Sequence, residues 1–240
     1  MPHQPKLEIK SILTQGKISL QGQFRYGSNY TFLVSVEQDG VAVPAVYKPM
    51  RGEQTLWDFP EASLARRERT AYLVSEALGF GFVPFTVIRD GPYGPGSLQE
   101  FIDHNPNLHY FTFPQSVREQ LRPVAIFDLL VNNADRKGGH ILLQKRTRRL
   151  YLIDHGLCFH AEDKLRTVIW DFAGQAFPPE LVARLKDFQV RFSPWAAASL
   201  TSLLEPDELQ ALETRLAKLV HIPVFPPPPD DRRAFPFPPV

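Results

Sequence analysis

The chain has 240 residues, of which 43% are hydrophobic and 22% charged, and this composition excludes a wholly disordered protein. A net charge of +1 argues against binding nucleic acid through a global positive field, and the single cysteine, Cys158, excludes an internal disulfide and a cysteine-rich zinc site. Since no apolar run reaches the ~18 residues of a spanning helix, we expect a cytoplasmic protein with no membrane span and no nucleic-acid partner.

The first third of the chain is predicted to be rich in β-strands. Apolar and polar residues alternate in four short runs, and the pair Asp39–Gly40 is typical of a hairpin turn between the last two. These runs are 7–13, 17–24, 30–36 and 41–48. Residues 61–78 then predict a helix that ends at Gly79, and residues 82–103 predict two strands around a turn rich in Gly and Pro.

The remainder predicts mostly helices with one hairpin among them. Pro123 suits the first turn of a helix that runs to about Asn132, and the loop NNADRKGGH follows. Two short apolar strands, 141–144 and 150–153, are joined by the basic turn KRTRR. Further helices are expected at 178–188, 194–204 and 206–220, before a tail too rich in proline for helix or sheet.

This order of elements predicts an α+β fold with two lobes in a single domain, residues 1–240. The N-terminal lobe would span residues 7–102 and be rich in strands. The C-terminal lobe would span residues 103–220, be mostly helical and contain the hairpin, and residues 221–240 would form the proline-rich tail. A cleft between two lobes is a usual place for a ligand.

Lys48 and Glu68 are the candidate functional residues of the N-terminal lobe. Lys48 ends an apolar strand, where a lysine either extends into solvent or presents its ammonium group to phosphate oxygens in the cleft. Glu68 lies on the helical stripe that carries Leu64 and Leu78, and a carboxylate on a half-buried stripe needs a cation beside it. Lys48 is the candidate partner; the alternative is a solvated glutamate at the rim.

Asp135 and Asp154 are the candidates in the C-terminal lobe. Asp135 lies in the loop before the hairpin, where a carboxylate is otherwise a turn former, and Asp154 directly follows the second strand. Because the start of one antiparallel strand lies beside the end of its partner, both carboxylates should emerge at the same edge of the hairpin. A carboxylate at such an edge is a good ligand for a hard cation such as Mg²⁺.

These four residues together form a set suited to phosphoryl transfer, a reaction that needs positioning and charge neutralisation more than covalent chemistry. Lys48 would hold phosphates, and Glu68 would orient Lys48. Asp135 would orient an attacking hydroxyl or accept its proton, and Asp154 would hold a metal between two phosphates. Lys137 could add a positive charge at the transferred group.

The same segments resemble the protein-kinase-like superfamily, and within it the phosphatidylinositol 3-/4-kinase-like and HipA-like branch. NADR at 133–136 resembles that branch's catalytic loop, IDHGLCF at 153–159 its metal motif, VYKP at 46–49 its nucleotide lysine and residues 65–78 its αC-like helix. The combination is most similar to a small bacterial phosphatidylinositol-kinase-like family. The resemblance covers roughly residues 10–200 and implies ATP and Mg²⁺ or Mn²⁺ as cofactors, but fold similarity leaves the acceptor open.

The resemblance also implies nucleotide contacts in the N-terminal lobe. Residues 25–32 occupy the position of the glycine-rich phosphate loop but contain a single glycine, so Ser28, Asn29 and nearby backbone N–H groups would contact phosphate. The segment LQEFID corresponds to the hinge between lobes, where adenine would bond to backbone groups near Glu100 and Phe101.

His140 departs from the pattern of kinase-like loops, which have asparagine at this position, five residues after the catalytic aspartate, as a second metal ligand. Neutral imidazole binds metals, although it suits transition metals better than Mg²⁺. Four interpretations are open. His140 could bind Mn²⁺ or Mg²⁺, contact phosphate directly, mark a catalytically weakened site, or only hydrogen-bond within its loop.

The leading expectation is therefore an ATP- and divalent-metal-dependent phosphotransferase. A protein hydroxyl or a small molecule is preferred to an inositol lipid as the acceptor, because the sequence lacks an amphipathic basic helix and a strong positive charge. The sparse glycine loop and His140 leave two alternatives, a nucleotide-binding pseudokinase-like regulatory module and a nucleotidyltransferase.

A third hypothesis concerns the proline-rich tail. FPPPP at 225–229 and FPFPP at 235–239 could form polyproline II helices and bind a partner's aromatic groove. The alternative is that their phenylalanines pack the tail back on the larger lobe, and the sequence slightly favours this packing.

Overall fold

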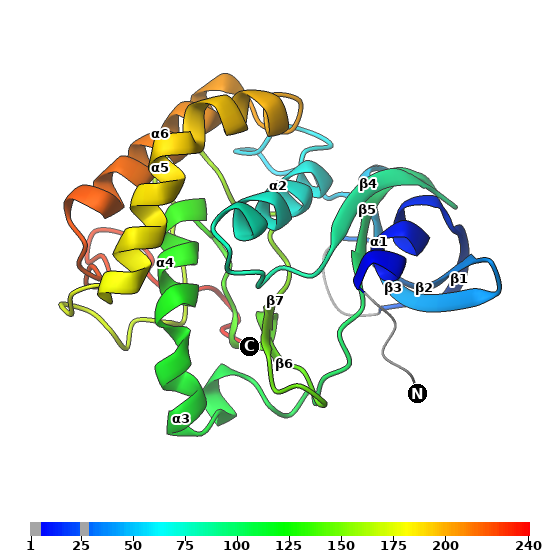
Figure 1. Cartoon of the computed structure of the whole chain (residues 1–240), viewed down its shortest axis with the longest axis horizontal. Coiled ribbons are helices and arrows are strands. Elements are labelled where there is room, and N and C mark those ends of the chain that lie inside the picture. The colour runs from blue at the N-terminus through cyan, green and yellow to red at the C-terminus, as the bar shows by residue number, and fades with distance from the viewer. Residues whose placement is uncertain (1–5, 25–28) are drawn as a thin grey trace.

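The computed structural model describes residues 6–24 and 29–240, which form two lobes side by side (Figure 1). The smaller lobe contains a five-stranded sheet and the first helix, and the larger lobe is mainly helical. Helix α2 (Leu64–Ala77) and the hairpin of β6 (Ile141–Leu143) and β7 (Leu150–Leu152) lie between them in the view of Figure 1. The arrangement confirms the α+β, two-lobed fold class.

The sheet of the smaller lobe is antiparallel throughout, with strand order β1-β2-β3-β5-β4. Asp39 and Gly40 have φ values of 51° and 76°, as a tight hairpin turn between β2 and β3 requires. The central strand β3 pairs Lys48 with Ser97 of β5, and this register places the lysine at the end of the sheet that faces the cleft. The strands are β1 (Lys17–Gln23), β2 (Phe32–Gln38), β3 (Val41–Pro49), β4 (Thr86–Gly91) and β5 (Gly94–Glu100).

The strand predicted at 7–13 is wrong, because this segment belongs to helix α1 (Lys6–Gln15). Strict alternation breaks at Ser11, whereas Ile9, Ile12 and Leu13 recur at helical spacing. Ile12 and Leu13 are buried in the small core beneath the sheet. Packing of one helical face against the sheet therefore overrides the short alternating pattern.

Helix α2 begins where Glu53 caps it. The Glu53 carboxylate accepts hydrogen bonds from the amides of Leu64, at 3.0 Å, and Ala65, at 2.9 Å. These N–H groups have no partner inside the helix, and a negative charge is favourable at a helix N-terminus. The helix is followed by the predicted Gly79, whose φ of 67° suits a residue without a side chain.

The larger lobe is built on α4 (Arg122–Val131), α5 (Pro179–Ser199) and α6 (Pro206–His221). Pro123 lies in the first turn of α4, as predicted, and the helix ends where Asn132 adopts a left-handed φ of 53°. Shorter helical segments are η1 (Met50–Gly52), η2 (Tyr110–Thr112), α3 (Gln115–Arg118), η3 (Glu119–Leu121) and η4 (Gly138–His140).

The helices predicted at 178–188 and 194–204 are joined in the single helix α5, with Pro194 in its interior. Proline removes one backbone hydrogen bond from a helix interior and disfavours continuation. Phe188, Phe192 and Ala196 nevertheless continue one buried stripe across the proline into the main core. Continuous burial of this face therefore outweighs the local preference for a break.

The main apolar core lies in the larger lobe, where α4, α5 and α6 pack together and against α2 and the hairpin. A smaller core lies between α1 and the sheet. The polar residues of the cleft are thus held at the boundary of two separately packed cores. Within the described ranges, every helix is too short or too polar to cross a membrane.

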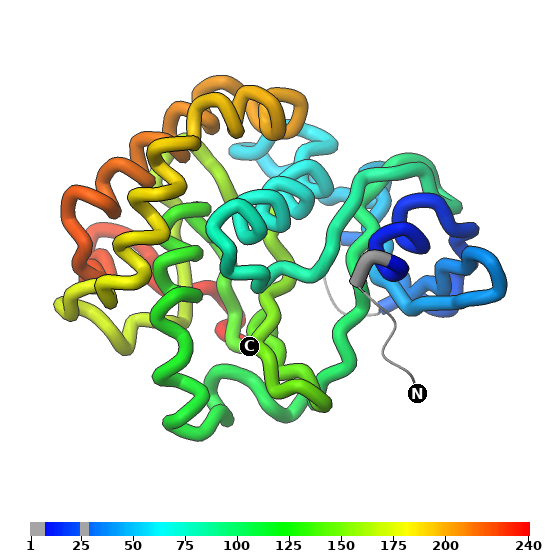
Figure 2. The backbone as a smooth tube through the Cα atoms, viewed as in Figure 1, coloured from blue at the N-terminus to red at the C-terminus, as the bar shows by residue number. Residues whose placement is uncertain are grey.

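Residues 222–240 contain no helix or strand, as predicted, and they run back along the larger lobe toward the hairpin (Figure 2). The Thr167 amide donates to the Ala234 carbonyl at 3.1 Å, and the Gly138 amide donates to the Pro239 carbonyl at 2.8 Å. Phe225 is buried, whereas Phe237 is 74% exposed. The tail therefore packs on the lobe and ends beside the loop that carries Asp135.

Candidate functional site

A pocket between the lobes is lined by all four candidate residues, Lys48, Glu68, Asp135 and Asp154. It encloses about 680 Å³, part of which is open to solvent. Strand β3 and helix α2 supply the first two residues, and the loops on either side of the β6–β7 hairpin supply the two aspartates. The fold thus brings together residues that are up to 106 positions apart in the chain.

Lys48 joins the two lobes through its ammonium group. Its Nζ lies 2.5 Å from Glu68 Oε1 and 2.9 Å from Asp154 Oδ1, which confirms the predicted Lys48–Glu68 pair. Burial alone would lower the pKa of Lys48, but the two carboxylates outweigh it and hold the pKa above its usual value. In return, the Lys48 ammonium holds the pKa of Asp154 well below its usual range. Lys48 and Asp154 are therefore both ionised at neutral pH.

The hairpin places the two aspartates as the sequence predicts. Ile141 at the start of β6 pairs with Leu152 at the end of β7, so Asp135 and Asp154 emerge at the same edge. Asp154 has a φ of 60°, in the left-handed region that aspartate tolerates better than most residues. This sharp turn after β7 lets the carboxylate point into the cleft.

Asp135 sits in a mixed electrostatic environment. Burial raises its pKa to about 6, Lys137 opposes that shift, and the negative charge of Asp154 adds to it. Lys137 Nζ lies 3.3 Å from Asp135 Oδ2. A carboxylate with a raised pKa is a better proton acceptor than an ordinary surface aspartate.

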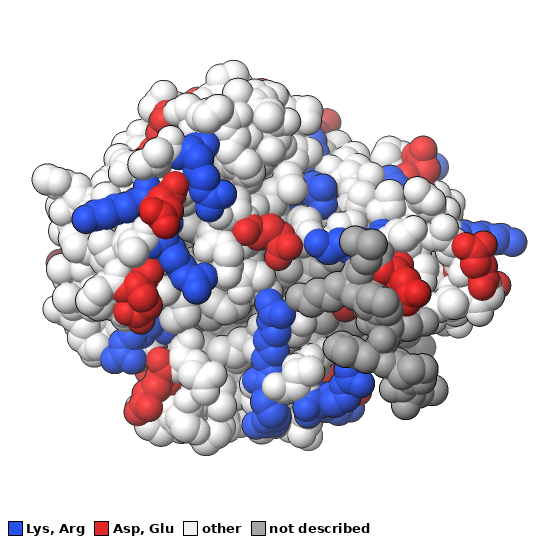
Figure 3. Space-filling model, viewed as in Figure 1, with Lys and Arg blue, Asp and Glu red and all other residues white. Residues whose placement is uncertain are grey.

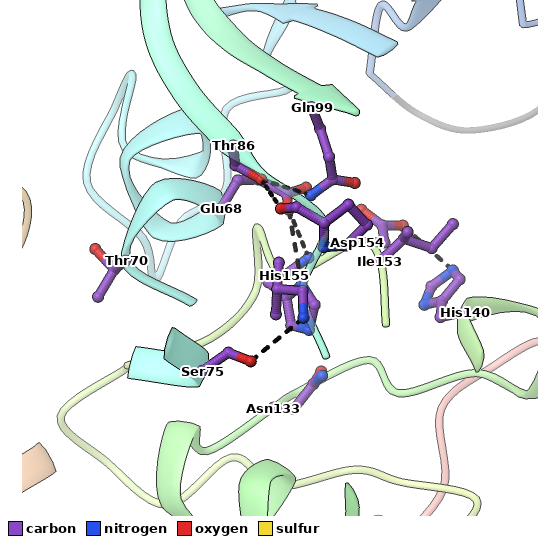
Figure 4. Close-up of polar contacts among 12 residues, drawn as sticks. Glu68, Thr70, Ser75, Thr86, Gln99, Asn133, His140, Ile153, Asp154 and His155 are labelled. Carbon is purple, nitrogen blue, oxygen red and sulfur yellow. Dashed lines mark hydrogen bonds and ion pairs between the residues drawn. The ribbon is translucent and has the colours of Figure 1, made fainter. Parts of the chain in front are cut away.

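His140 lies on the far side of Asp154 from Glu68 (Figure 4). Its Nδ1 is 3.1 Å from the Asp135 carbonyl, which can only accept a hydrogen bond, so Nδ1 carries the proton. Its Nε2 then presents a lone pair to Asp154 Oδ2 at 3.2 Å. Burial lowers the pKa of His140 to about 4, which keeps the ring neutral at pH 7. Two acceptors therefore converge, as they do where a cation is bound.

Arg136, which follows Asp135, ties the two loops together from behind. Its side chain is fully buried, and Nε donates to Asp128 Oδ1 and Oδ2 at 3.0 and 3.1 Å. Nη1 donates to the Ile153 carbonyl at 3.0 Å, and Nη2 lies 2.8 Å from His155 Nε2. The guanidinium therefore fixes the loop before β6 relative to the loop after β7.

His155 connects this arginine to Glu68. Because Arg136 can only donate, His155 Nε2 accepts and its Nδ1 carries the proton. That Nδ1 has no hydrogen-bond partner and faces Glu68 Oε2 at 3.8 Å, while the His155 amide donates to the same oxygen at 3.1 Å (Figure 4). Glu68 is thus held from both sides, by Lys48 and by the His155 segment.

The nucleotide contacts expected from the resemblance meet different outcomes. Ser28 lies outside the described residues. Asn29 lines the pocket, but its Oδ1 accepts the Gln54 amide at 2.6 Å, so at present it orders the pocket wall. The amides of Glu100 and Phe101 donate to the carbonyls of Phe85 and Pro44, at 2.9 and 3.3 Å. Adenine recognition at the hinge would therefore need backbone groups other than these two amides.

Several residues of the site were missed by sequence reasoning. Asp128 stood as a lone charge in the apolar run VAIFDLLV, which is a signal that a buried cation must lie beside it. Arg136 stood in the NADR motif without an assigned part. Glu53 had no signal, because capping α2 from outside the helix depends on how the preceding segment folds back.

Known proteins resemble this chain in sequence and in fold. Residues 61–183 match the phosphatidylinositol 3- and 4-kinase family, a range that contains Asp135 and Asp154 but not Lys48. The Mycobacterium tuberculosis protein Rv2133c is 35% identical over an alignment of 263 positions that covers 95% of this chain and 94% of that protein. Phosphatidylinositol 4-kinase gamma 4 of Oryza sativa subsp. japonica is 29% identical over 160 positions, 55% of this chain and 28% of the rice protein.

The crystal structure of the Helicobacter pylori proinflammatory kinase CtkA has a similar fold, with a TM-score of 0.53 over 88% of this chain and 93% of that chain. At 12% identity this likeness concerns the fold alone. The family match covers half of the chain, and the mycobacterial relative is similar over nearly its whole length. The chain therefore belongs to the phosphatidylinositol 3- and 4-kinase family and has a kinase-like fold.

Proposed function

We propose that the protein is an ATP- and divalent-metal-dependent phosphotransferase whose acceptor is a hydroxyl group of a protein or a small molecule. The observation that carries the proposal is the pocket in which Lys48 and Glu68 of one lobe face Asp135 and Asp154 of the other. The arrangement offers a fixed positive charge, a proton acceptor and a cation ligand at separate points. Membership of a kinase family supports the reaction class.

Each side chain has its own part in this mechanism. Lys48 would neutralise phosphate oxygens, and Glu68 keeps the Lys48 ammonium group in the cleft. Asp135 would take the proton of the acceptor hydroxyl while the hydroxyl oxygen bonds to the γ-phosphorus of ATP. The bond from that phosphorus to the β–γ bridging oxygen breaks, and ADP leaves. Lys137, beside Asp135, would balance charge on the transferred group.

Asp154, which lines the pocket, and the adjacent His140 form a donor set that fits a divalent cation. Asp154 Oδ2 and His140 Nε2 present two lone pairs 3.2 Å apart. Among the residues that the structure describes, no three His, Cys, Asp or Glu side chains could hold a metal by themselves. Phosphate oxygens and water would complete the coordination, as they commonly do for Mg²⁺, and the imidazole would favour Mn²⁺. When bound, the ion would neutralise negative charge on the phosphates.

The charge distribution supports a protein or small-molecule acceptor over a membrane lipid. Acidic and basic side chains are interspersed over the face shown in Figure 3, and basic groups gather at its lower edge, where the β6–β7 turn lies. An anionic membrane surface attracts clusters of several Lys and Arg residues. The turn Lys145–Arg149 is a short segment of this kind, and its Lys145 is already paired with Asp103.

Thermal stability tests nucleotide and metal binding directly. Saturating ATP with Mg²⁺, and separately with Mn²⁺, should stabilise the wild-type protein by about 2.7 kcal/mol at 100 times the Kd. Asp154→Ala should abolish the metal-dependent part. Asp103→Ala is the matched control, because this aspartate also pairs with a lysine but lies outside the pocket, with a side chain 70% exposed.

The alternatives give different results in the same series. No stabilisation with either metal would contradict the ATP proposal. Stabilisation without phosphate transfer to any acceptor would favour a pseudokinase-like regulatory module. Mass spectrometry of modified acceptors separates an added phosphate from an added AMP, and AMP would identify a nucleotidyltransferase.

A further inference from the structure

Arg67, the neighbour of Glu68 on α2, crosses from one lobe to the other and is buried there. Its side chain is 1% exposed, although a guanidinium is always charged in proteins. Nη1 donates to the Cys158 carbonyl at 2.5 Å, Nη2 donates to Glu208, and Nε donates to Ser63 Oγ at 3.3 Å. Each nitrogen of the guanidinium thus has a partner, and two of these partners belong to the larger lobe.

Glu208 is the acidic end of this connection. It lies in the first turn of α6, where a helix N-terminus favours negative charge, and its side chain is 7% exposed. Its second oxygen accepts the Glu205 amide at 3.0 Å. Arg67 and Glu208 therefore form a buried and well-satisfied ion pair that joins α2 to α6 across 141 positions of sequence.

A contribution to folding stability does not by itself explain why such an ion pair is buried. A buried ion pair is often no better than apolar side chains of similar size, because both charges lose their hydration. Separating the two partners while they stay buried is very unfavourable, and disfavours the separated state by roughly 10²- to 10⁴-fold. The pair therefore fixes the position of α2, because this helix cannot move away from the larger lobe without breaking the ion pair.

The Arg67–Glu208 pair maintains the position of Glu68. Arg67 anchors α2 at Cys158, and Glu68 anchors it at the amide of His155, three residues earlier in the same loop. On its other side, α2 is tied to the sheet by Arg69, which donates to the Thr86 carbonyl. The helix is thus attached to both lobes, with Lys48 and Glu68 between the attachments.

We propose that Arg67 and Glu208 are positioning residues that hold α2 against the larger lobe and so keep Glu68 paired with Lys48. The catalytic consequence rests on the proposed function, whereas the attachment of α2 does not. The chain itself thus supplies the contacts that keep this helix beside Lys48.

The main experiment replaces the buried pair with apolar side chains of similar size. Arg67→Met/Glu208→Met should fold with an unfolding temperature close to that of the wild type, because avoiding the desolvation of two charges offsets the hydrogen bonds lost at Cys158 and Glu205. Its kcat for phosphate release from ATP should fall roughly 10- to 100-fold, with a small change in the KM for ATP, because misplacing a catalytic group acts mainly on the transition state.

The control pair joins the same helix to α1, because Glu76 lies on α2 and Lys10 lies on α1. Lys10 and Glu76 form an ion pair at 3.6 Å whose side chains are 41% and 43% exposed. Lys10→Met/Glu76→Met should leave kcat unchanged. If the buried double variant fails to fold, Arg67→Lys is the second test, because lysine keeps the charge but cannot bond Glu208 and the Cys158 carbonyl with a planar fork.

A distance measurement separates this proposal from the proposed function. Spin labels at exposed positions 76 on α2 and 210 on α6, in a Cys158→Ser background, should give a narrow distance distribution that broadens when Arg67 and Glu208 are replaced. An unchanged distribution, or unchanged turnover in a folded double variant, overturns the proposal. If the wild-type protein neither binds ATP nor releases phosphate, the proposed function fails, and the distance distribution still decides whether the pair holds α2.

Discussion

Two networks of charged residues lie on opposite sides of the loop at 133–140, and they differ in what they leave open. On the cleft side, the side chains of Lys48 and Asp154 are 25% and 47% exposed. On the inner side, Arg136 and Asp128 are both 0% exposed. In the cleft network, the lone pairs of Asp154 Oδ2 and His140 Nε2 are directed at one another, whereas in the inner network the Arg136 guanidinium donates to the Asp128 carboxylate.

This difference distinguishes the side chains that can bind a ligand from the buried side chains that orient those ligand-binding side chains. Asp154 and His140 present acceptors without a proton between them, a mismatch that a bound cation would remove. Arg136 instead holds the backbone at Ile153 and the ring of His155, on either side of Asp154. A supporting group of this kind orients the residue that binds, and it contributes to stability as well as to function.

The largest expected effect comes from breaking the cleft network at its proton acceptor. Asp135→Asn should lower the rate of phosphate transfer roughly 10²- to 10⁴-fold, because it removes a general base. The free energy of unfolding should stay the same or rise, since burial already disfavours the charged form of this carboxyl group. Turnover and urea unfolding, measured on the same samples, check the expected loss of rate and the expected stability. A large loss of stability would place Asp135 with the inner network.

In the inner network, by contrast, a substitution should lower the free energy of unfolding. Arg136→Met leaves the buried Asp128 carboxylate without its cation, and the free energy of unfolding should fall by about 3–5 kcal/mol. Urea unfolding measures this change. Lys145→Met removes a cation from an exposed pair and should cost less than about 1 kcal/mol. Equal effects of the two variants would contradict the distinction between the networks.

The tail tests whether the loop is also held from outside. Removing residues 232–240 deletes the carbonyls that accept the amides of Gly138 and Thr167, and the bond from Arg232 to the Leu165 carbonyl. Stability should fall by about 2 kcal/mol, because each hydrogen bond contributes roughly 0.5–1.5 kcal/mol.

Hydrogen exchange shows where this effect falls. The amides of Gly138 and Thr167 should lose protection in the truncated chain. Removing Val240 alone, which is 54% exposed, is the control and should leave both amides protected. Protection that survives the longer deletion would show that the tail is not what holds the loop.

The smallest expected effect sharpens the account of His140. His140→Asn should shift the preference between Mn²⁺ and Mg²⁺ toward Mg²⁺ by roughly tenfold, because an amide oxygen is a harder ligand than imidazole. Titration of ATP-dependent stabilisation with each metal measures the shift. His160→Asn also replaces a histidine bonded to a backbone carbonyl, that of Asp58, and should leave the preference unchanged. An unchanged ratio in His140→Asn would leave His140 with a role inside its loop.

The sequence by itself determined the elements whose signals are local. Asp39–Gly40, Gly79 and Pro123 mark turns and helix ends because their backbone preferences act within a few residues. The hairpin at 141–153 has the same local origin, and its geometry follows from pairing alone, so the common edge of Asp135 and Asp154 could be predicted. The pairing of Glu68 with Lys48 was also within reach, because a carboxylate on a buried helical stripe requires a cation.

Tertiary structure decided what depends on distant partners. Residues 6–15 form a helix because the apolar face of that helix packs on the sheet. Helix α5 continues through Pro194 because its apolar stripe is buried both before and after the proline. Arg136 and Arg67 are ordinary arginines in the sequence, and their parts come from burial beside Asp128 and Glu208. A local pattern reports the preferences of neighbouring residues, whereas the cost of burying a charge is set by the partner that the fold brings to it.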